Sequence, residues 1–132
     1  MVKIEIFNET KNRIAKAVFQ KLAKKAGRIL KKNCDLGVLF CGDKKIRELN
    51  KKYRKKDKPT DVLSFGYKKG VWSGDIIISL DTAKKQAKEK GHSLEKELEI
   101  LFVHGMLHVA GFDHETDAEE AKMEKVAAKI LN

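Results

Sequence analysis

The chain has 132 residues, of which 42% are hydrophobic and 36% are charged, as in an ordinary globular protein. A chain of this length forms one domain and buries roughly two-thirds of its unfolded surface. No apolar run reaches the ~20 residues that a membrane span needs, and the N-terminus lacks the layout of a secretory signal. We therefore expect a single cytoplasmic domain, residues 1–132, without a membrane partner.

The formal net charge is +10, and it is distributed unevenly along the chain. Residues 1–70 contain 21 Lys and Arg against 7 Asp and Glu, whereas residues 71–132 contain 8 against 12. An electropositive first half would attract polyanions, nucleic acid above all. A solvated basic surface suited to heat is the alternative explanation, because abundant Lys and Glu are typical of thermophilic proteins.

The first half of the chain alternates strand and helix patterns. Residues 2–7 alternate apolar and charged side chains, which predicts a strand. Apolar residues recur at helical spacing across residues 11–32, which predicts a helix with a lysine-rich, solvated face. Residues 34–41 are almost continuously apolar, as in the central strand of a sheet. Asp43 is placed to cap a helix over residues 44–54.

The two cysteines, Cys34 and Cys41, lie at opposite ends of the strand predicted over residues 34–41. An extended strand places them about 23 Å apart, at ~3.3 Å per residue. A disulfide needs Cα atoms within about 7 Å of each other. We therefore expect two free thiols that serve as small core residues.

A loop around the only proline, over residues 55–61, precedes two further strand patterns. These strands are predicted over residues 62–65 and 74–80, and they lie so close in sequence that an antiparallel hairpin is their simplest connection. Asp81 is placed to cap a short helix over residues 81–90.

Two more helices complete the predicted fold. Ser93 is placed to cap a helix that runs through His108. One face of this helix carries a stripe of Glu97, Leu101, His104 and His108. Asp117 and Glu120 form a capping box that opens the last helix.

Three of the four histidines lie within residues 104–114. His104 and His108 are spaced i, i+4, so that on a helix their imidazoles lie one above the other and can hold one metal ion. Gly111 predicts the end of the helix, because glycine adopts the left-handed conformation without a Cβ penalty. The chain can then bring His114 to the same ion. Three imidazoles favour one zinc ion and leave a fourth position for water, as in catalytic sites.

Gly105 distinguishes this segment from the zinc helix of metalloproteases. Their motif, His-Glu-x-x-His, has a glutamate as general base at the position that Gly105 holds here. A zinc peptidase is therefore the weaker alternative, and the basic first half also argues against it. A protein that binds RNA without cutting it and holds a structural zinc is a further alternative. Structural zinc sites usually have four protein ligands, so the open fourth position argues against this alternative without excluding it.

Three blocks of the sequence resemble the signature of the YbeY endoribonucleases, a bacterial family. The first block is His104-Gly-x-Leu-His108-x-x-Gly-x-Asp-His114. The second is Leu49-Asn-x-x-Tyr-Arg54-x-x-Asp57-x-Pro59-Thr-Asp61-Val-Leu-Ser-Phe65, and the third is Gly74-Asp75-Ile76. Their order and spacing agree with the family, and the resemblance spans nearly the whole chain.

The resemblance implies a zincin-like α+β domain, with a four-stranded mixed sheet, about five helices and a metal site at the C-terminal end of a helix. It implies a zinc-dependent, single-strand-specific endoribonuclease that acts in maturation of the 16S rRNA 3′ end and in ribosome quality control. The ribosome or its small subunit is then the expected partner, and the alternative that binds RNA without cutting it would be an RNA-binding ribosome assembly factor with a structural zinc. It also implies His104, His108 and His114 as ligands of one Zn²⁺, Arg54 as an important arginine, and no organic cofactor.

Charged residues near these blocks complete the candidate site. Arg54, which we pair with His108 as catalytic, offers a planar fork that matches phosphate. The RNA backbone would be bound by Lys51, Lys52, Arg54, Lys55, Lys56 and Lys58. The general base is open among Asp113, Asp61 and Asp75, each of which can instead be a strand-end, cap or ligand-orienting residue. We expect Ser64 to be structural and His92 to be a surface residue.

Overall fold

The computed structural model describes residues 1–68, 70–113 and 115–132. Its elements are β1 (Val2–Asn8), α1 (Lys16–Leu30), β2 (Cys34–Cys41), α2 (Asp43–Arg54), β3 (Val62–Gly66), β4 (Ser73–Ser79), α3 (Leu80–Lys90), α4 (Leu94–Val109) and α5 (Asp117–Leu131). Within these ranges, the four strands and five helices confirm the predicted α+β class. None of the helices in the described ranges combines the length and apolar character that a bilayer crossing requires.

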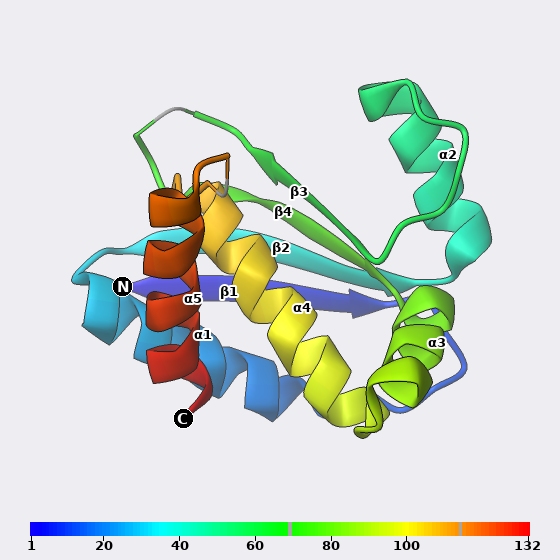
Figure 1. The fold of residues 1–132 in the computed structure, drawn as a ribbon, viewed down its shortest axis with the longest axis horizontal. Coiled ribbons are helices and arrows are strands. Elements are labelled where there is room, and N and C mark those ends of the chain that lie inside the picture. The colour runs from blue at the N-terminus through cyan, green and yellow to red at the C-terminus, as the bar shows by residue number, and fades with distance from the viewer. Residues whose placement is uncertain (69, 114) are drawn as a thin grey trace.

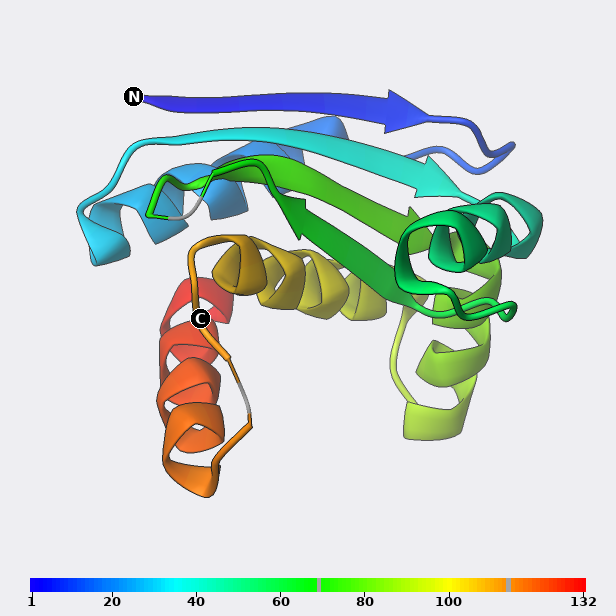
Figure 2. The same cartoon turned by 90° about the horizontal axis from the view of Figure 1, so that it is seen from above.

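The strands form one mixed sheet in the order β1-β2-β4-β3. β2 runs parallel to β1 and to β4, and β3 pairs antiparallel with β4 as the predicted hairpin. The central position of β2 explains its nearly continuous apolar sequence. The helices α1, α4 and α5 lie on one face of the sheet, and α2 lies at one end of the opposite face (Figures 1 and 2).

The main core lies between the sheet and α1, α4 and α5. The ring centroid of Phe19 on α1 is 5.1 Å from that of Phe40 on β2 and 5.3 Å from that of Phe102 on α4, so aromatic contacts tie these three elements together. A smaller cluster under α2 contains Cys41, Ile46, Leu63 and Ile77. Both cysteines are buried and free, as predicted.

The first residues of α2 and α3 exchange hydrogen bonds. Asp81 Oδ2 accepts from the backbone nitrogen of Asp43 at 2.8 Å. Asp43 Oδ1 in turn accepts from the hydroxyls of Ser79 and Thr82, each at 2.6 Å. The prediction that Asp43 and Asp81 each cap their own helix was wrong, because Gly42 and Ser79 occupy the N-cap positions. The carboxylates serve the neighbouring helix start instead.

Side-chain hydrogen bonds also delay the start of α1, which was predicted at residue 11 and begins at Lys16. The backbone nitrogen of Thr10 donates to Asn8 Oδ1 at 2.9 Å, and Asn8 Nδ2 donates to the backbone oxygen of Asn12 at 2.7 Å. Such local bonds satisfy backbone groups without a helix.

The caps of α4 and α5 follow the prediction in one case only. Ser93 Oγ accepts from the backbone nitrogen of Lys96 at 3.1 Å and caps α4 as predicted. Thr116 caps α5, because its Oγ1 accepts from the backbone nitrogen of Glu119 at 3.1 Å. Asp117, predicted to be the cap, lies one residue later in the first turn.

His92 is a partner of a buried carboxylate and not the predicted surface residue. Its side chain is 20% exposed, and its Nε2 lies 2.6 Å from Oε1 of Glu97, which is fully buried. Lys90 Nζ lies 3.2 Å from Glu97 Oε2. These contacts fix the first turns of α4 against the end of α3, and so set the direction of the helix that carries the histidines.

Candidate functional site

The C-terminal end of α4 places His104 and His108 on one face, one helical turn apart. Both side chains are partly exposed, and His104 Nε2 lies 3.8 Å from Glu124 Oε1 on α5. Gly111, at φ 103°, follows the end of α4 in the left-handed region as predicted, and its nitrogen donates to the backbone oxygen of His108 at 3.0 Å. The chain therefore reverses directly after the second histidine.

The third implied ligand, His114, lies outside the described residues. Among the residues that are described, no group of three His, Cys, Asp or Glu side chains is close enough to hold a metal ion. The two described imidazoles fit a zinc ion, because they share one helix face and are accessible at its end. The zinc ion and its three-histidine ligand set stay a prediction.

A groove of about 440 Å³ opens beside His108. Its lining includes Arg54 from the end of α2, Lys56 and Lys58 from the following loop, and Asp61 before β3. The groove thus joins the first and second sequence blocks in one concave surface. It combines an imidazole with three cationic side chains, which is chemistry suited to a phosphodiester.

Arg54 is held at the rim of this groove by its neighbours on β3. Its Nη2 donates to the backbone oxygen of Ser64 at 2.8 Å, and its Cζ lies 5.1 Å from the ring centroid of Phe65. A guanidinium has five N–H donors, so this bond leaves others for a phosphate. Ser64 contributes its backbone oxygen here, in line with its predicted structural role.

Asn50 positions the loop that carries the two groove lysines. Its side chain is buried, and its Nδ2 donates to the backbone oxygen of Lys58 at 2.9 Å. The backbone nitrogen of Lys56 donates to the oxygen of Asn50 at 3.3 Å. Arg47 and Asp57 add an exposed pair at 2.8 Å, and this guanidinium lowers the pKa of the Asp57 carboxyl. Sequence reasoning missed Asn50, although it stands in the second block beside Leu49.

The other three predicted RNA-binding lysines lie away from the groove lining. Lys51 lines a separate hollow on α2 together with Asp57. Lys52 Nζ lies 5.2 Å from the ring centroid of Tyr53. Lys55 is the left-handed C-cap of α2, at φ 58°. The structure therefore separates the predicted lysine set into a groove pair and three residues elsewhere on the α2 segment.

Asp61 is the acidic candidate that the structure brings into the groove with His108 and Arg54. Its Oδ1 accepts from the backbone nitrogen of Val62 at 2.7 Å, and its Oδ2 accepts from Gln86 Nε2 at 3.3 Å. These bonds are those of a strand-end residue, which is one of the roles that the sequence left open for Asp61. They hold the carboxylate against Val62 and Gln86.

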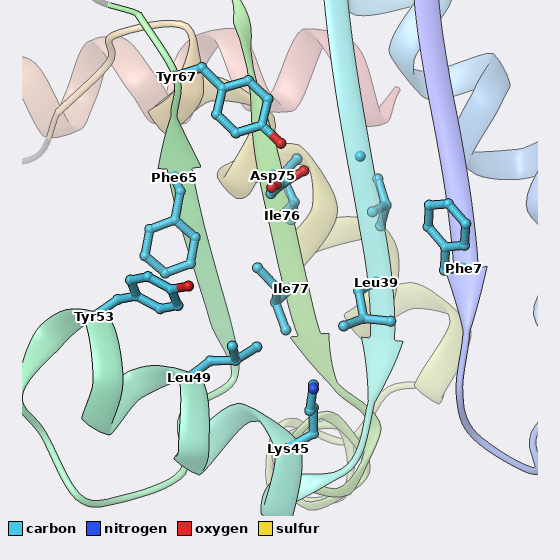
Figure 3. Close-up of a pocket in the computed structure, with 12 residues that line it drawn as sticks. Phe7, Leu39, Lys45, Leu49, Tyr53, Phe65, Tyr67, Asp75, Ile76 and Ile77 are labelled. Carbon is cyan, nitrogen blue, oxygen red and sulfur yellow. The ribbon is translucent and has the colours of Figure 1, made fainter.

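Asp75 lies on the opposite face of the sheet from α4. The next residue on β4, Ile76, contacts Gly105, and a Cβ at position 105 would be 2.7 Å from Ile76 Cγ2. Because side chains alternate along a strand, Asp75 points to the other face, where Figure 3 shows it beside Tyr67. Asp75 therefore lines the hollow on that face and not the groove at His108, and its role as a base candidate stays a prediction. The role of Asp113 stays a prediction.

Comparisons with known proteins point to one family. A family model described as Endoribonuclease YbeY matches residues 2–132. The chain is 56% identical over 94 residues to an Endoribonuclease YbeY of Aquifex aeolicus, covering 68% of this chain and 63% of that relative. It is 41% identical over 133 residues to one of Acholeplasma laidlawii, covering 99% and 96%. The solution structure of TM1509 from Thermotoga maritima superposes with a TM-score of 0.67 at 30% identity, covering 98% of this chain and 89% of that one.

Proposed function

Because this chain belongs to the YbeY endoribonuclease family, we propose that residues 1–132 form a single metal-dependent endoribonuclease domain that cleaves single-stranded RNA. The observation that carries the proposal is the groove in which His108 meets Arg54, Lys56 and Lys58. Its cations suit a polyanionic substrate, and its imidazole suits a metal ion. We assign one zinc ion to His104, His108 and His114.

Hydrolysis of RNA requires water to add to phosphorus, one ester P–O bond to break, and a proton to reach the departing oxygen. Zinc, when bound, supplies Lewis acidity and lowers the pKa of water toward 7. Arg54 holds two phosphate oxygens with its fork and opposes the negative charge that develops on them. Lys56 and Lys58 bind the flanking backbone by charge.

Two carboxylates, those of Asp61 and Asp113, are the candidates for the proton acceptor, and each can instead orient a group of the site. Asp61 lies in the groove, but its two oxygens already accept from Val62 and Gln86. A carboxylate held in this way is suited to orienting water or a ligand. Asp113 directly precedes the third proposed ligand and would orient a histidine.

Family membership also supports a cellular role in maturation of the 16S rRNA 3′ end and in ribosome quality control, in the cytoplasm and with the small subunit as partner. The net charge of +10 supports an RNA partner of this kind. A zinc peptidase is disfavoured, because a glutamate at position 105 would have to occupy the space of Ile76 on the sheet.

The decisive experiment is cleavage of a labelled single-stranded RNA by purified protein of known zinc content. The wild type should cut, whereas His108→Ala and Arg54→Ala, purified identically, should bind RNA and cut at least ~100-fold more slowly. A duplex of the same sequence is the substrate control. Identical fragments from the wild type and His108→Ala would assign the cutting to a contaminating ribonuclease.

Removal of the metal separates a catalytic from a structural zinc. After treatment with a chelator, a catalytic ion leaves the far-ultraviolet circular dichroism spectrum intact while cleavage is lost, and added zinc restores cleavage. Two results together would favour the assembly factor with a structural zinc. The zinc-loaded wild type would bind RNA without cutting it, and the chelator would abolish the folded spectrum.

A further inference from the structure

The face of the sheet opposite α4 holds a second hollow, of about 590 Å³, beside α2 (Figure 3). Among the described residues, the aromatic side chains that are more than half exposed are Phe7 at 56%, Tyr53 at 57% and Tyr67 at 65%. All three line this hollow, although they come from β1, α2 and the segment after β3. A cluster of exposed aromatic rings on one concave surface marks a binding site rather than ordinary surface.

The polar groups of the hollow fix its shape. A Cβ at Gly37 would lie 2.5 Å from Asp75 Oδ1, so the carboxylate occupies space that only a glycine leaves on β2. Tyr67 forms a hydrogen bond with Asp75, and this contact raises the pKa of Tyr67 to about 12. The ring of Tyr67 is thus held in place by the floor of the sheet while its face stays exposed.

Cationic groups lie beside the hollow and over two of the aromatic rings that line it, those of Tyr53 and Phe65. Lys45 lines the hollow from α2, Lys52 Nζ lies 5.2 Å from the ring centroid of Tyr53, and Arg54 Cζ lies 5.1 Å from that of Phe65. Aromatic faces with cations beside them are the arrangement that binds single-stranded nucleic acid, because bases stack while phosphates meet the charges. The carboxylate of Asp75 suits the amino group of a base and repels phosphate.

Arg54 and Phe65 connect this hollow to the groove at His108. Arg54 lines the groove, and the ring on which it rests, Phe65, lines the hollow. Phe65 belongs to β3, one of the two edge strands of the sheet, so a flexible polymer can pass over this edge from one concave surface to the other. This continuity favours the polymer proposed for the groove, single-stranded RNA, as the occupant of the hollow as well.

We propose that the hollow binds bases of single-stranded RNA by stacking on Tyr53, Tyr67 and Phe7, while the adjoining backbone lies in the groove at His108. The proposal rests on the proposed function, which it extends by naming a second contact surface for the same substrate. It explains how a small domain would prefer single strands, since a duplex cannot offer unstacked bases to the hollow.

The test measures affinity for fluorescein-labelled single-stranded RNA in the 132-residue protein with His108→Ala, so that cleavage does not interfere. With an RNA of about 12 nucleotides, Tyr53→Ala and Tyr67→Ala should each weaken binding about 5- to 100-fold. Tyr67→Phe keeps the ring and should stay within about 3-fold of the parent. Val18→Ala, which removes an exposed apolar side chain on α1, is the matched control and should not change affinity.

The affinity for a short RNA of about 4 nucleotides should depend much less on Tyr53 and Tyr67. This length is the lower end of the site sizes of single-strand binders. Crosslinks from 4-thiouridine in the longer RNA should map to peptides that contain Tyr53 or Tyr67. Circular dichroism confirms that each variant is folded. Unchanged affinity in both tyrosine-to-alanine variants would overturn the proposal and leave the hollow to a different kind of partner.

The outcome is separable from that for the proposed function. If the wild type cuts RNA and the tyrosine variants bind RNA with the affinity of the parent protein, only the stacking proposal is contradicted. If no RNA is cut but RNA binding depends on Tyr53 and Tyr67, the proposed endoribonuclease activity is contradicted and the stacking proposal is supported. Absence of any RNA binding overturns both proposals.

Discussion

The indole Nε1 of Trp72 donates a hydrogen bond to the backbone oxygen of Met106 at 3.0 Å, inside the core. Met106 lies between His104 and His108 on α4, and Trp72 directly precedes β4. The bond therefore fixes the histidine-bearing turn of α4 to the start of a sheet strand. Its donor comes from the segment between the two predicted hairpin strands, for which the sequence predicted no contact with the helix of the histidines.

Replacing Trp72 by Phe should lower the free energy of unfolding by about 1–3 kcal/mol, because it removes a buried hydrogen bond and leaves a cavity. It should also weaken zinc binding, since the turn between the two histidines loses its anchor. Urea denaturation and competition with a chromophoric chelator measure the two effects. Val71→Ala, in the same segment but half exposed, is the control. Unchanged zinc affinity in a destabilised Trp72→Phe would limit the indole to a packing role.

The contact between Gly105 and Ile76 predicts that the helix cannot accept a side chain at position 105. Gly105→Ala should destabilise the fold by about 1–3 kcal/mol through overpacking, although alanine has the higher helix propensity. Gly105→Glu should be worse and should confer no peptidase activity. In a double-mutant cycle, Ile76→Ala should offset much of the cost of Gly105→Ala. Additive effects of the two substitutions would show that the helix moves away instead.

The division of the lysines predicts unequal salt dependence of RNA binding. Lys56→Ala and Lys58→Ala should each reduce the slope of log K against log salt concentration by about 0.7, the value for one phosphate contact on a single strand. Lys51→Ala removes the same charge from the separate hollow and should change the slope much less. Fluorescence anisotropy across a salt series measures all three. Equal slopes for Lys51→Ala and Lys56→Ala would assign the effect to net charge alone.

The hydrogen bond between Tyr67 and Asp75 predicts a pH effect at high pH. A phenol whose pKa is raised from 10 to about 12 binds its proton more tightly in the folded state. Its contribution to stability is therefore fully present below pH 10 and is lost as the pH rises toward 12. Asp75→Asn should lower the pKa of Tyr67, because it removes the carboxylate that accepts the bond and repels the phenolate.

Absorbance at 295 nm follows the ionisation of tyrosine, and Tyr53→Phe isolates the signal of Tyr67. The matched comparison is the Tyr53→Phe protein with and without Asp75→Asn, at pH values where both stay folded. An unchanged titration midpoint in the Asp75→Asn protein would contradict the hydrogen bond as the main cause.

Local features of the site were predictable from sequence, and features that depend on register were not. The spacing of His104 and His108 and the left-handed Gly111 follow from helix geometry within one short segment. The exclusion of Asp75 from the groove depends on which face of β4 meets α4, and Gly74-Asp75-Ile76 alone does not reveal this. The roles of Asn50 and Trp72 depend on contacts with a loop and a helix that follow them in the chain. Partners of this kind have no signature in sequence spacing.

The hydrogen bonds that Asp43 makes with Asp81, Ser79 and Thr82 join the start of α2 to the start of α3. Neither helix can unwind from its first turn without breaking contacts of the other, so their leading amides should exchange with solvent as one cooperative unit. The far end of α2 carries Arg54, and α3 leads into the helix of the histidines. The helix that ends at Arg54 and the element that leads into the helix of His104 and His108 therefore begin at one shared set of hydrogen bonds. A substitution that breaks these bonds should displace both Arg54 and His108, which line the same groove.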